Sequence, residues 1–219
     1  MKYKLLVFDL DGTLVNSLAD LAISVNEGLK KAGLKTHEIE KYKKFVGNGR
    51  EKLIDRAMGE SRDDENLRKI VKETFDSYYK AHCNDNTTSY KGCGKLLSDL
   101  KKAGVKTAVL SNKPDEFVND ILTKVYPNHK FDSAWGKRNE YPVKPCPEAL
   151  NAMLKELNVE KSECLYIGDS DVDIFTANNA EVDMLGVDWG FRGRKELIDA
   201  GAKYVASSAD EILEYINEN

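Results

Sequence analysis

Two short apolar stretches of this chain each end in a group of aspartates. The first, LLVF, is followed by Asp9 and Asp11, and the second, CLYIG, is followed by Asp169, Asp171 and Asp173. A continuously apolar run of this length is typical of a parallel strand that is covered on both faces. If the two strands lie close together in one sheet, several acidic oxygens converge at one point, and a hard cation is needed to make this tolerable. The pattern therefore predicts a Mg²⁺ site suited to phosphate chemistry.

Predicted strands and helices alternate through the second half of the chain. Strands are predicted at residues 3–10, 106–110, 164–167, 184–187 and 204–206, with a short one around Asp132. Helices are predicted at residues 92–103, 114–125, 147–157, 171–179, 194–200 and 210–217. Units of this length predict an α/β fold, a doubly wound parallel sheet with helices on both faces. Ligands bind such sheets beyond the carboxyl ends of the strands, where Asp9, Ser111 and Asp169 are expected.

Between residues 16 and 88 the pattern is helical, and no strand is predicted there. Apolar residues recur at helical spacing over residues 17–32, where Ser17 is a candidate N-cap and Gly33 a stop signal. Further helices are predicted at residues 38–45, 51–58 and 66–81. This block predicts an all-α helical cap domain inserted into the core. We expect residues 1–15 and 84–219 to form the core and residues 16–83 to form the cap.

Composition argues against several kinds of partner. With a net charge of -4, the chain offers no general basic surface for a nucleic acid. No stretch approaches the ~20 consecutive apolar residues of a membrane span, and the N-terminal apolar run is too short for a signal peptide. The four cysteines form no CxxC pair. We therefore expect a cytoplasmic monomer or homodimer that binds neither nucleic acid nor membrane.

Four motifs occur in order along the chain. They are FDLDGTLVNS at residues 8–17, LSNK at 110–113, KPCPE at 144–148 and GDSDVDI at 168–174. Together they resemble the motifs of the haloacid dehalogenase-like (HAD) phosphatases, and the helical block resembles the cap that this family inserts after the first strand. The run at residues 189–208 is similar to the corresponding stretch of phosphoglycolate phosphatases. The resemblance implies a Rossmann-like core, Mg²⁺ as cofactor, and hydrolysis of a small phosphorylated metabolite.

The aspartates take distinct roles in this interpretation. A carboxylate nucleophile such as Asp9 is repelled by a phosphate unless positive charge screens both groups. The resemblance gives the metal ligands as the Asp9 carboxylate, the Asp11 backbone carbonyl and the Asp169 carboxylate. Asp173 would hold metal-bound water. Asp11 would protonate the leaving oxygen and later deprotonate the attacking water.

Other residues are expected to contact the phosphate or the rest of the substrate. Ser111 offers a hydroxyl to a phosphoryl oxygen, and Asn112 lies beside it in the sequence. Lys144 supplies a compact positive charge. Gly12 permits a tight turn and close approach of backbone N–H groups. Arg50, in the cap segment GNGR, is a candidate for binding an anionic group.

Several alternatives remain open at this point. Asp171 is interpreted as a helix-capping residue and Lys113 as a solvated or supporting charge, although a role in the site is open for both. The same motifs fit a phosphosugar mutase of the β-phosphoglucomutase kind, a pyrophosphatase or nucleotidase, or a non-catalytic protein that binds phosphate and metal. A true dehalogenase is set aside, because it needs neither the second aspartate, Asp11, nor the metal-binding acids.

Overall fold

The computed structural model describes residues 2–219 and contains one six-stranded parallel sheet with the strand order β5-β4-β1-β6-β7-β8. The strands are β1 (Leu5–Phe8), β4 (Lys106–Pro114), β5 (Ser133–Lys137), β6 (Cys164–Gly168), β7 (Asp183–Val187) and β8 (Val205–Ala206). The chain leaves β1 toward β4 and β5, and later returns to the other side of β1 with β6. This reversal makes β1 the switch point, beside which doubly wound sheets bind their ligands.

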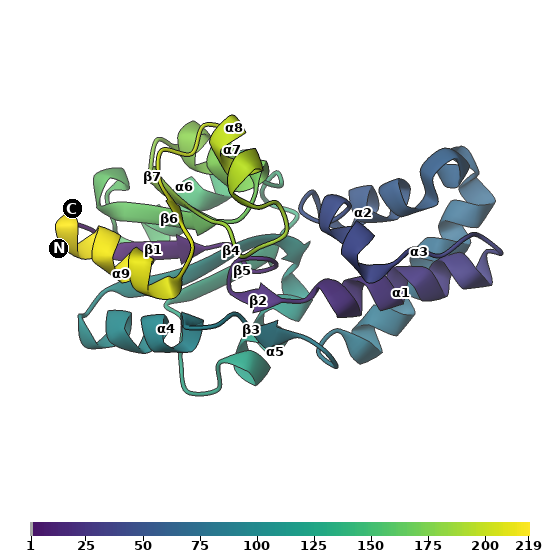
Figure 1. Ribbon diagram of the computed structural model, residues 1–219, viewed down its shortest axis with the longest axis horizontal. Helices are drawn as coiled ribbons and strands as arrows, with labels where there is room; N and C mark the ends of the chain where they lie inside the picture. Colours follow the sequence, from purple (N-terminus) through teal and green to yellow (C-terminus); the bar gives the residue numbers. More distant parts are fainter. Residues whose placement is uncertain (1) are drawn as a thin grey trace.

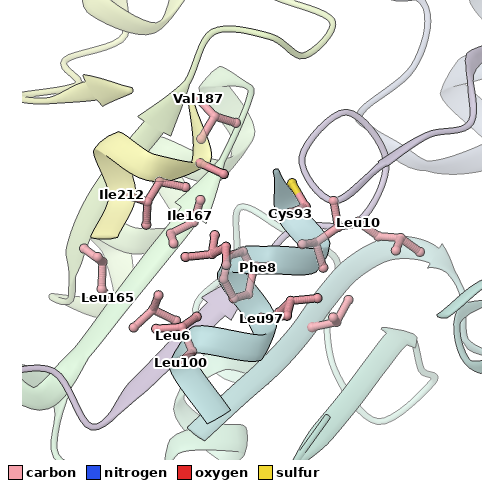
Figure 2. Close-up of a cluster of buried hydrophobic side chains, with 14 of the residues drawn as sticks. Leu6, Phe8, Leu10, Cys93, Leu97, Leu100, Leu165, Ile167, Val187 and Ile212 are labelled. Atoms are coloured by element: carbon pink, nitrogen blue, oxygen red, sulfur yellow. The ribbon is translucent and has the colours of Figure 1, made fainter. Parts of the chain in front are cut away.

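Helices cover the sheet on both faces, as the fold prediction required (Figure 1). They are α4 (Cys93–Lys102), α5 (Asp115–Val125), α6 (Glu148–Leu157), η3 (Lys161–Glu163), α7 (Asp171–Ala180), α8 (Arg194–Asp199) and α9 (Ala209–Glu218). Side chains alternate across β1, so Leu6 and Phe8 pack with α4, α5 and α9, whereas Leu5 and Val7 pack with α6 and α7. Figure 2 shows Phe8 within the first of these clusters. The α/β fold class with a doubly wound parallel sheet is confirmed.

A separate group of helices lies beyond the carboxyl ends of the strands, at the end of the molecule opposite the chain termini (Figure 1). It consists of α1 (Leu18–Lys31), η1 (Ile39–Lys44), α2 (Gly49–Met58), η2 (Gly59–Asp63) and α3 (Glu65–His82). These helices share a hydrophobic core of their own, in which α1 packs along α3. We call this group the helical cap; where the cap domain ends and the core domain begins stays a prediction.

The structure differs from the predicted elements in two places near the cap. Residues 39–44 form a 3-10 helix rather than an α-helix, and Tyr42 is the one buried residue in it, so this segment has no apolar face for a longer α-helix. Two short strands that were not predicted, β2 (Val15–Asn16) and β3 (Thr88–Ser89), pair in antiparallel orientation. Two residues are too few to show a strand periodicity in sequence.

Asp20 joins the two segments that connect the cap to the core. This buried carboxylate on α1 accepts hydrogen bonds from the Asn86 backbone N–H at 2.9 Å, the Asn86 side-chain amide at 2.8 Å and the Thr87 hydroxyl at 2.6 Å. The outgoing and returning chain segments are therefore held together twice, by β2 with β3 and by Asp20.

We predict that Asp20→Ala lowers the free energy of unfolding by about 1.5 to 3 kcal/mol, because it leaves the donors of the returning segment without their charged acceptor. Urea unfolding measures this change. The control is Asp63→Ala, which removes a side chain that is 88% exposed and should change the free energy by less than about 0.5 kcal/mol. Equal effects of the two substitutions would contradict the prediction.

Candidate active site

The ends of β1 and β6 bring Asp9 and Asp169 together. The two strands are paired so that Phe8 lies beside Ile167, and the Asp9 backbone N–H donates to the Ile167 carbonyl at 2.8 Å. Both carboxylates are buried. With Asp173, from the first turn of α7, they offer oxygen atoms that lie within 4.8 Å of one another. Two groups far apart in sequence thus form one cluster of three carboxylates.

Lys144 places its ammonium group against this cluster of carboxylates. It lies in the loop between β5 and α6, is buried, and donates to Asp9 Oδ1 at 2.8 Å, to Asp173 Oδ1 at 2.7 Å and to the Tyr166 hydroxyl at 3.0 Å. Burial alone would lower the pKa of Lys144, but Asp173 and Asp9 raise it well above its usual value. Lys144 is therefore charged at any physiological pH. Sequence reasoning missed Tyr166, which is the single polar side chain within the apolar run of β6.

Negative charge exceeds positive charge in the cluster, since three carboxylates surround one ammonium. Burial raises the pKa of Asp9 to about 7; Lys144 offsets part of this effect, and Asp173 and Asp11 add to it. Burial, followed by the charges of Asp173 and Asp9, also raises the pKa of Asp169 well above its usual value. A further cation beside Asp9 and Asp169 would favour their ionised forms.

Asp173 and Asp169 are held differently. Both Asp173 oxygens are occupied, one by Lys144 and Tyr166 and the other by the backbone N–H and hydroxyl of Ser170, which form a capping box at the start of α7. Asp169 accepts a hydrogen bond from the Phe191 backbone N–H at 2.6 Å. Thr13 contributes a longer contact to Asp169 at 3.4 Å.

The backbone of two glycines lies against the Asp169 side chain. At Gly12, where φ is +97°, a Cβ atom would lie 2.3 Å from Asp169 Oδ2, and at Gly190 a Cβ would lie 2.3 Å from the same oxygen. No other residue type fits at these two positions unless Asp169 moves. Gly12 therefore brings backbone close to Asp169, and its expected approach to the phosphate stays a prediction.

Asp11 stands apart from the three-carboxylate cluster. Both of its oxygens accept hydrogen bonds from Lys113 Nζ at 2.9 Å, and the Ser17 hydroxyl donates to Oδ1 at 2.5 Å. Lys113 is buried, so the interpretation of this residue as a solvated charge is wrong and its role as a supporting charge fits the structure. Its burial follows from β4, which continues through Pro114 instead of ending at Leu110 as predicted.

Ser111 and Asn112 lie on this extended part of β4. Ser111 is buried and lines the same pocket as Asp9 and Asp11. The Asn112 side chain instead binds the Lys144 backbone in both directions, accepting from its N–H at 2.8 Å and donating to its carbonyl at 3.1 Å. It also donates to the Gly47 carbonyl of the cap at 3.3 Å. Asn112 thus positions the loop that carries Lys144.

A pocket between cap and core opens onto Asp9, Asp11 and Ser111. Arg50, on α2, lines this pocket, but its guanidinium is paired with Asp76 at 2.7 Å and Glu51 at 3.2 Å. The cap side of the pocket is otherwise mostly apolar, with Leu21, Val46, Leu53, Phe75 and Tyr79. Asp171 lies in the first turn of α7 and, among residues 2–219, makes no side-chain hydrogen bond to the acidic cluster.

Arg192 connects the core to the cap. It follows Phe191, whose backbone holds Asp169, and its guanidinium donates to the Lys43 and Val46 carbonyls of the cap at 2.8 Å each. Its side chain is 9% exposed. One loop therefore contacts both the acidic cluster and the cap.

The acidic cluster at the switch point of a doubly wound parallel sheet, beneath a helical cap, places the chain among α/β enzymes that bind their ligands at this edge of the sheet. Residues 6–187 match the haloacid dehalogenase-like hydrolases, and the chain belongs to this family. It is similar to the phosphoglycolate phosphatase of Vibrio parahaemolyticus, with 33% identity over 97% of this chain and 96% of that protein. Identity with the phosphoglycolate phosphatase of Colwellia psychrerythraea is 34%, over 96% and 95% of the two chains.

Solved structures show the same likeness. A candidate phosphoglycolate phosphatase from Lactobacillus delbrueckii subsp. bulgaricus superposes with a TM-score of 0.92 at 34% identity, covering 99% of both chains. The resemblance inferred from the motifs is confirmed, and the chain is a phosphatase. No helix within residues 2–219 is long and apolar enough to cross a membrane.

The excess negative charge predicts that Asp9→Asn stabilises the metal-free protein. The Asp9 pKa is about 7 in the fold and 3.8 without its surroundings, so between these pH values the folded state binds more protons and stability falls as the pH rises. In the presence of a chelator, the melting temperature of Asp9→Asn should exceed that of wild type at pH 8, and the difference should shrink toward pH 4. A less stable variant at pH 8 would contradict this reading of the cluster.

Proposed function

We propose that the chain is a Mg²⁺-dependent phosphomonoesterase that hydrolyses a small substrate such as phosphoglycolate through an aspartyl-phosphate on Asp9. The observation that carries this proposal is the position of Asp9, whose carboxylate lies within the acidic cluster and beside the Lys144 ammonium. The substrate suggestion rests on the phosphoglycolate phosphatases that resemble the chain over nearly its whole length.

The residues of the cluster fit Mg²⁺. The cluster offers only oxygen atoms, which Mg²⁺ prefers, and it carries more negative charge than Lys144 balances. Both Asp173 oxygens already accept hydrogen bonds, which favours direct ligation by Asp9 and Asp169 and a supporting role for Asp173. The Asp11 backbone carbonyl is the third proposed protein ligand. When bound, the ion would screen the repulsion between the attacking carboxylate and the phosphate.

Asp9 is suited to act as the nucleophile. Oδ1 is held by Lys144, and Oδ2 accepts no hydrogen bond from residues 2–219. In the proposed reaction an Asp9 oxygen bonds to phosphorus as the ester oxygen leaves, and Asp11 gives that oxygen a proton. Asp11 then takes a proton from water as the water attacks the aspartyl-phosphate, which releases phosphate and restores Asp9.

Lys144 and Ser111 stabilise the transferring phosphoryl group in this proposal. Lys144 is fixed by two carboxylates and by Asn112, so its charge needs no reorganisation when the substrate arrives. A preorganised donor of this kind contributes about 2.7 to 4 kcal/mol to the transition state. Gly12 brings backbone close to the phosphate, and Arg50 adds positive charge at the pocket wall. The closed cap excludes water from the aspartyl-phosphate until hydrolysis.

Release of inorganic phosphate from phosphoglycolate tests the function. We expect wild-type activity with Mg²⁺, loss of activity with a chelator, and at least a thousandfold or so lower kcat in Asp9→Asn. Circular dichroism shows whether the variant is folded. A folded Asp9→Asn variant with wild-type kcat would reject the nucleophile, and isomerisation of a hexose phosphate without phosphate release would identify a mutase.

Metal binding has a readout that does not depend on activity. We predict that Mg²⁺ at about a hundred times its Kd stabilises the wild-type protein by about 2.7 kcal/mol at pH 8, and that Asp169→Asn loses this stabilisation. The matched control is Asp171→Asn, two residues away, which should keep it because Asp171 does not contact the cluster. Thermal unfolding with and without Mg²⁺ measures both variants, and a full Mg²⁺ effect in Asp169→Asn would refute the proposed ligand.

A further inference from the structure

Tyr79 places an unused hydroxyl group at the candidate active site. It lies on α3 of the cap, is 1% exposed, and lines the pocket that also contains Asp9 and Asp11. Its ring packs against Phe75 of the cap and Phe117 of α5, each at 5.2 Å between centroids. Its hydroxyl donates no hydrogen bond to any group within residues 2–219.

Packing alone does not explain a tyrosine at this position. Burying a hydroxyl without a partner costs free energy, and phenylalanine would make the same ring contacts without this cost. Tyr42, another buried tyrosine of the cap, shows the ordinary arrangement, because its hydroxyl donates to Asn26 Oδ1 at 2.7 Å. The hydroxyl of Tyr79 therefore points to a partner that the protein itself does not supply.

Lys113 brings a buried positive charge to the same place. Its Nζ lies 5.0 Å from the centroid of the Tyr79 ring and donates to the two Asp11 oxygens. Burial alone would lower the pKa of Lys113, but Asp11 and the nearby Tyr79 hydroxyl raise it, so the phenolic oxygen faces this ammonium group. Because an ammonium cannot accept a hydrogen bond, Lys113 cannot satisfy the phenolic proton of Tyr79. The phenolic proton of Tyr79 thus remains available beside the Lys113 charge.

The other residues that line the pocket restrict which ligands can bind there. The nearby cap residues Leu21, Leu53 and Phe75 are apolar and give no partners to a polyhydroxylated sugar. Arg50 is already paired with Asp76 and Glu51. A small ligand with one anionic group, aimed at Tyr79 and Lys113, matches these surroundings best.

We propose that the Tyr79 hydroxyl and Lys113 Nζ form a subsite for a carboxylate on the leaving group. The site then selects phosphate monoesters that carry a carboxylate within a few bonds of the ester oxygen, and disfavours neutral alcohol phosphates and sugar phosphates. This inference rests on the proposed phosphatase function and adds a cap residue and a substrate class to it.

The test compares phosphoglycolate with ethyl phosphate, in which a methyl group replaces the carboxylate. Tyr79→Phe should lower kcat/KM for phosphoglycolate about tenfold or more, the loss expected for a hydrogen bond to a charged group, and change kcat/KM for ethyl phosphate less than about threefold. Tyr42→Phe is the control and should leave the ratio between the two substrates unchanged. Equal losses on both substrates in Tyr79→Phe, or no loss on either, would overturn the subsite.

Thermal unfolding without substrate gives an independent readout. Since the phenolic proton of Tyr79 has no acceptor among the described residues, Tyr79→Phe should melt at the wild-type temperature or above it, whereas Tyr42→Phe should melt lower. A lower melting temperature for Tyr79→Phe would mean that the protein itself binds the hydroxyl, and would also overturn the subsite. If the wild-type enzyme releases phosphate from neither ester, the proposed function fails; activity on ethyl phosphate with an unchanged substrate ratio rejects the subsite alone.

Discussion

Three carboxylates buried around one ammonium group are the constraint on which the rest of this structure depends. Like charges repel strongly away from water, and burial already raises the pKa of Asp9 to about 7. The fold nevertheless brings Asp9 and Asp169 together from adjacent strands and holds them with backbone groups. Such an arrangement lowers stability and is retained where chemistry requires it. A divalent cation would remove the cost and also screen an incoming phosphate.

The surroundings of the cluster follow from this constraint. Glycine at positions 12 and 190 leaves room for Asp169, and Asn112 fixes the loop that presents Lys144. The cap adds apolar side chains and a few polar groups to the wall of the pocket. Because Arg192 holds the cap from a loop that also holds Asp169, the cap and the acidic cluster share one support.

Much of this arrangement could be predicted from the sequence, since the signals are local. Apolar runs predicted the strands, and helical spacing predicted the helices. Aspartates that directly follow strands predicted the acidic cluster. The β2–β3 pair was missed because two residues show no periodicity, and the length of β4 was missed because Ser111, Asn112 and Lys113 are polar but buried. The contacts of individual side chains could not be predicted either. Nothing in the sequence indicated that Asn112 would bind the Lys144 backbone, or that Tyr79 would reach the pocket from the cap.

Proton release on binding Mg²⁺ tests the central claim most directly. Because burial raises the pKa values of Asp9 and Asp169 and a bound cation would favour their ionised forms, binding of Mg²⁺ must expel protons near pH 7. Titration calorimetry in buffers of different ionisation enthalpy counts these protons. The account predicts release at pH 7, and markedly less release when Asp9 is replaced by Asn. Tight binding of Mg²⁺ without proton release at pH 7 would contradict it.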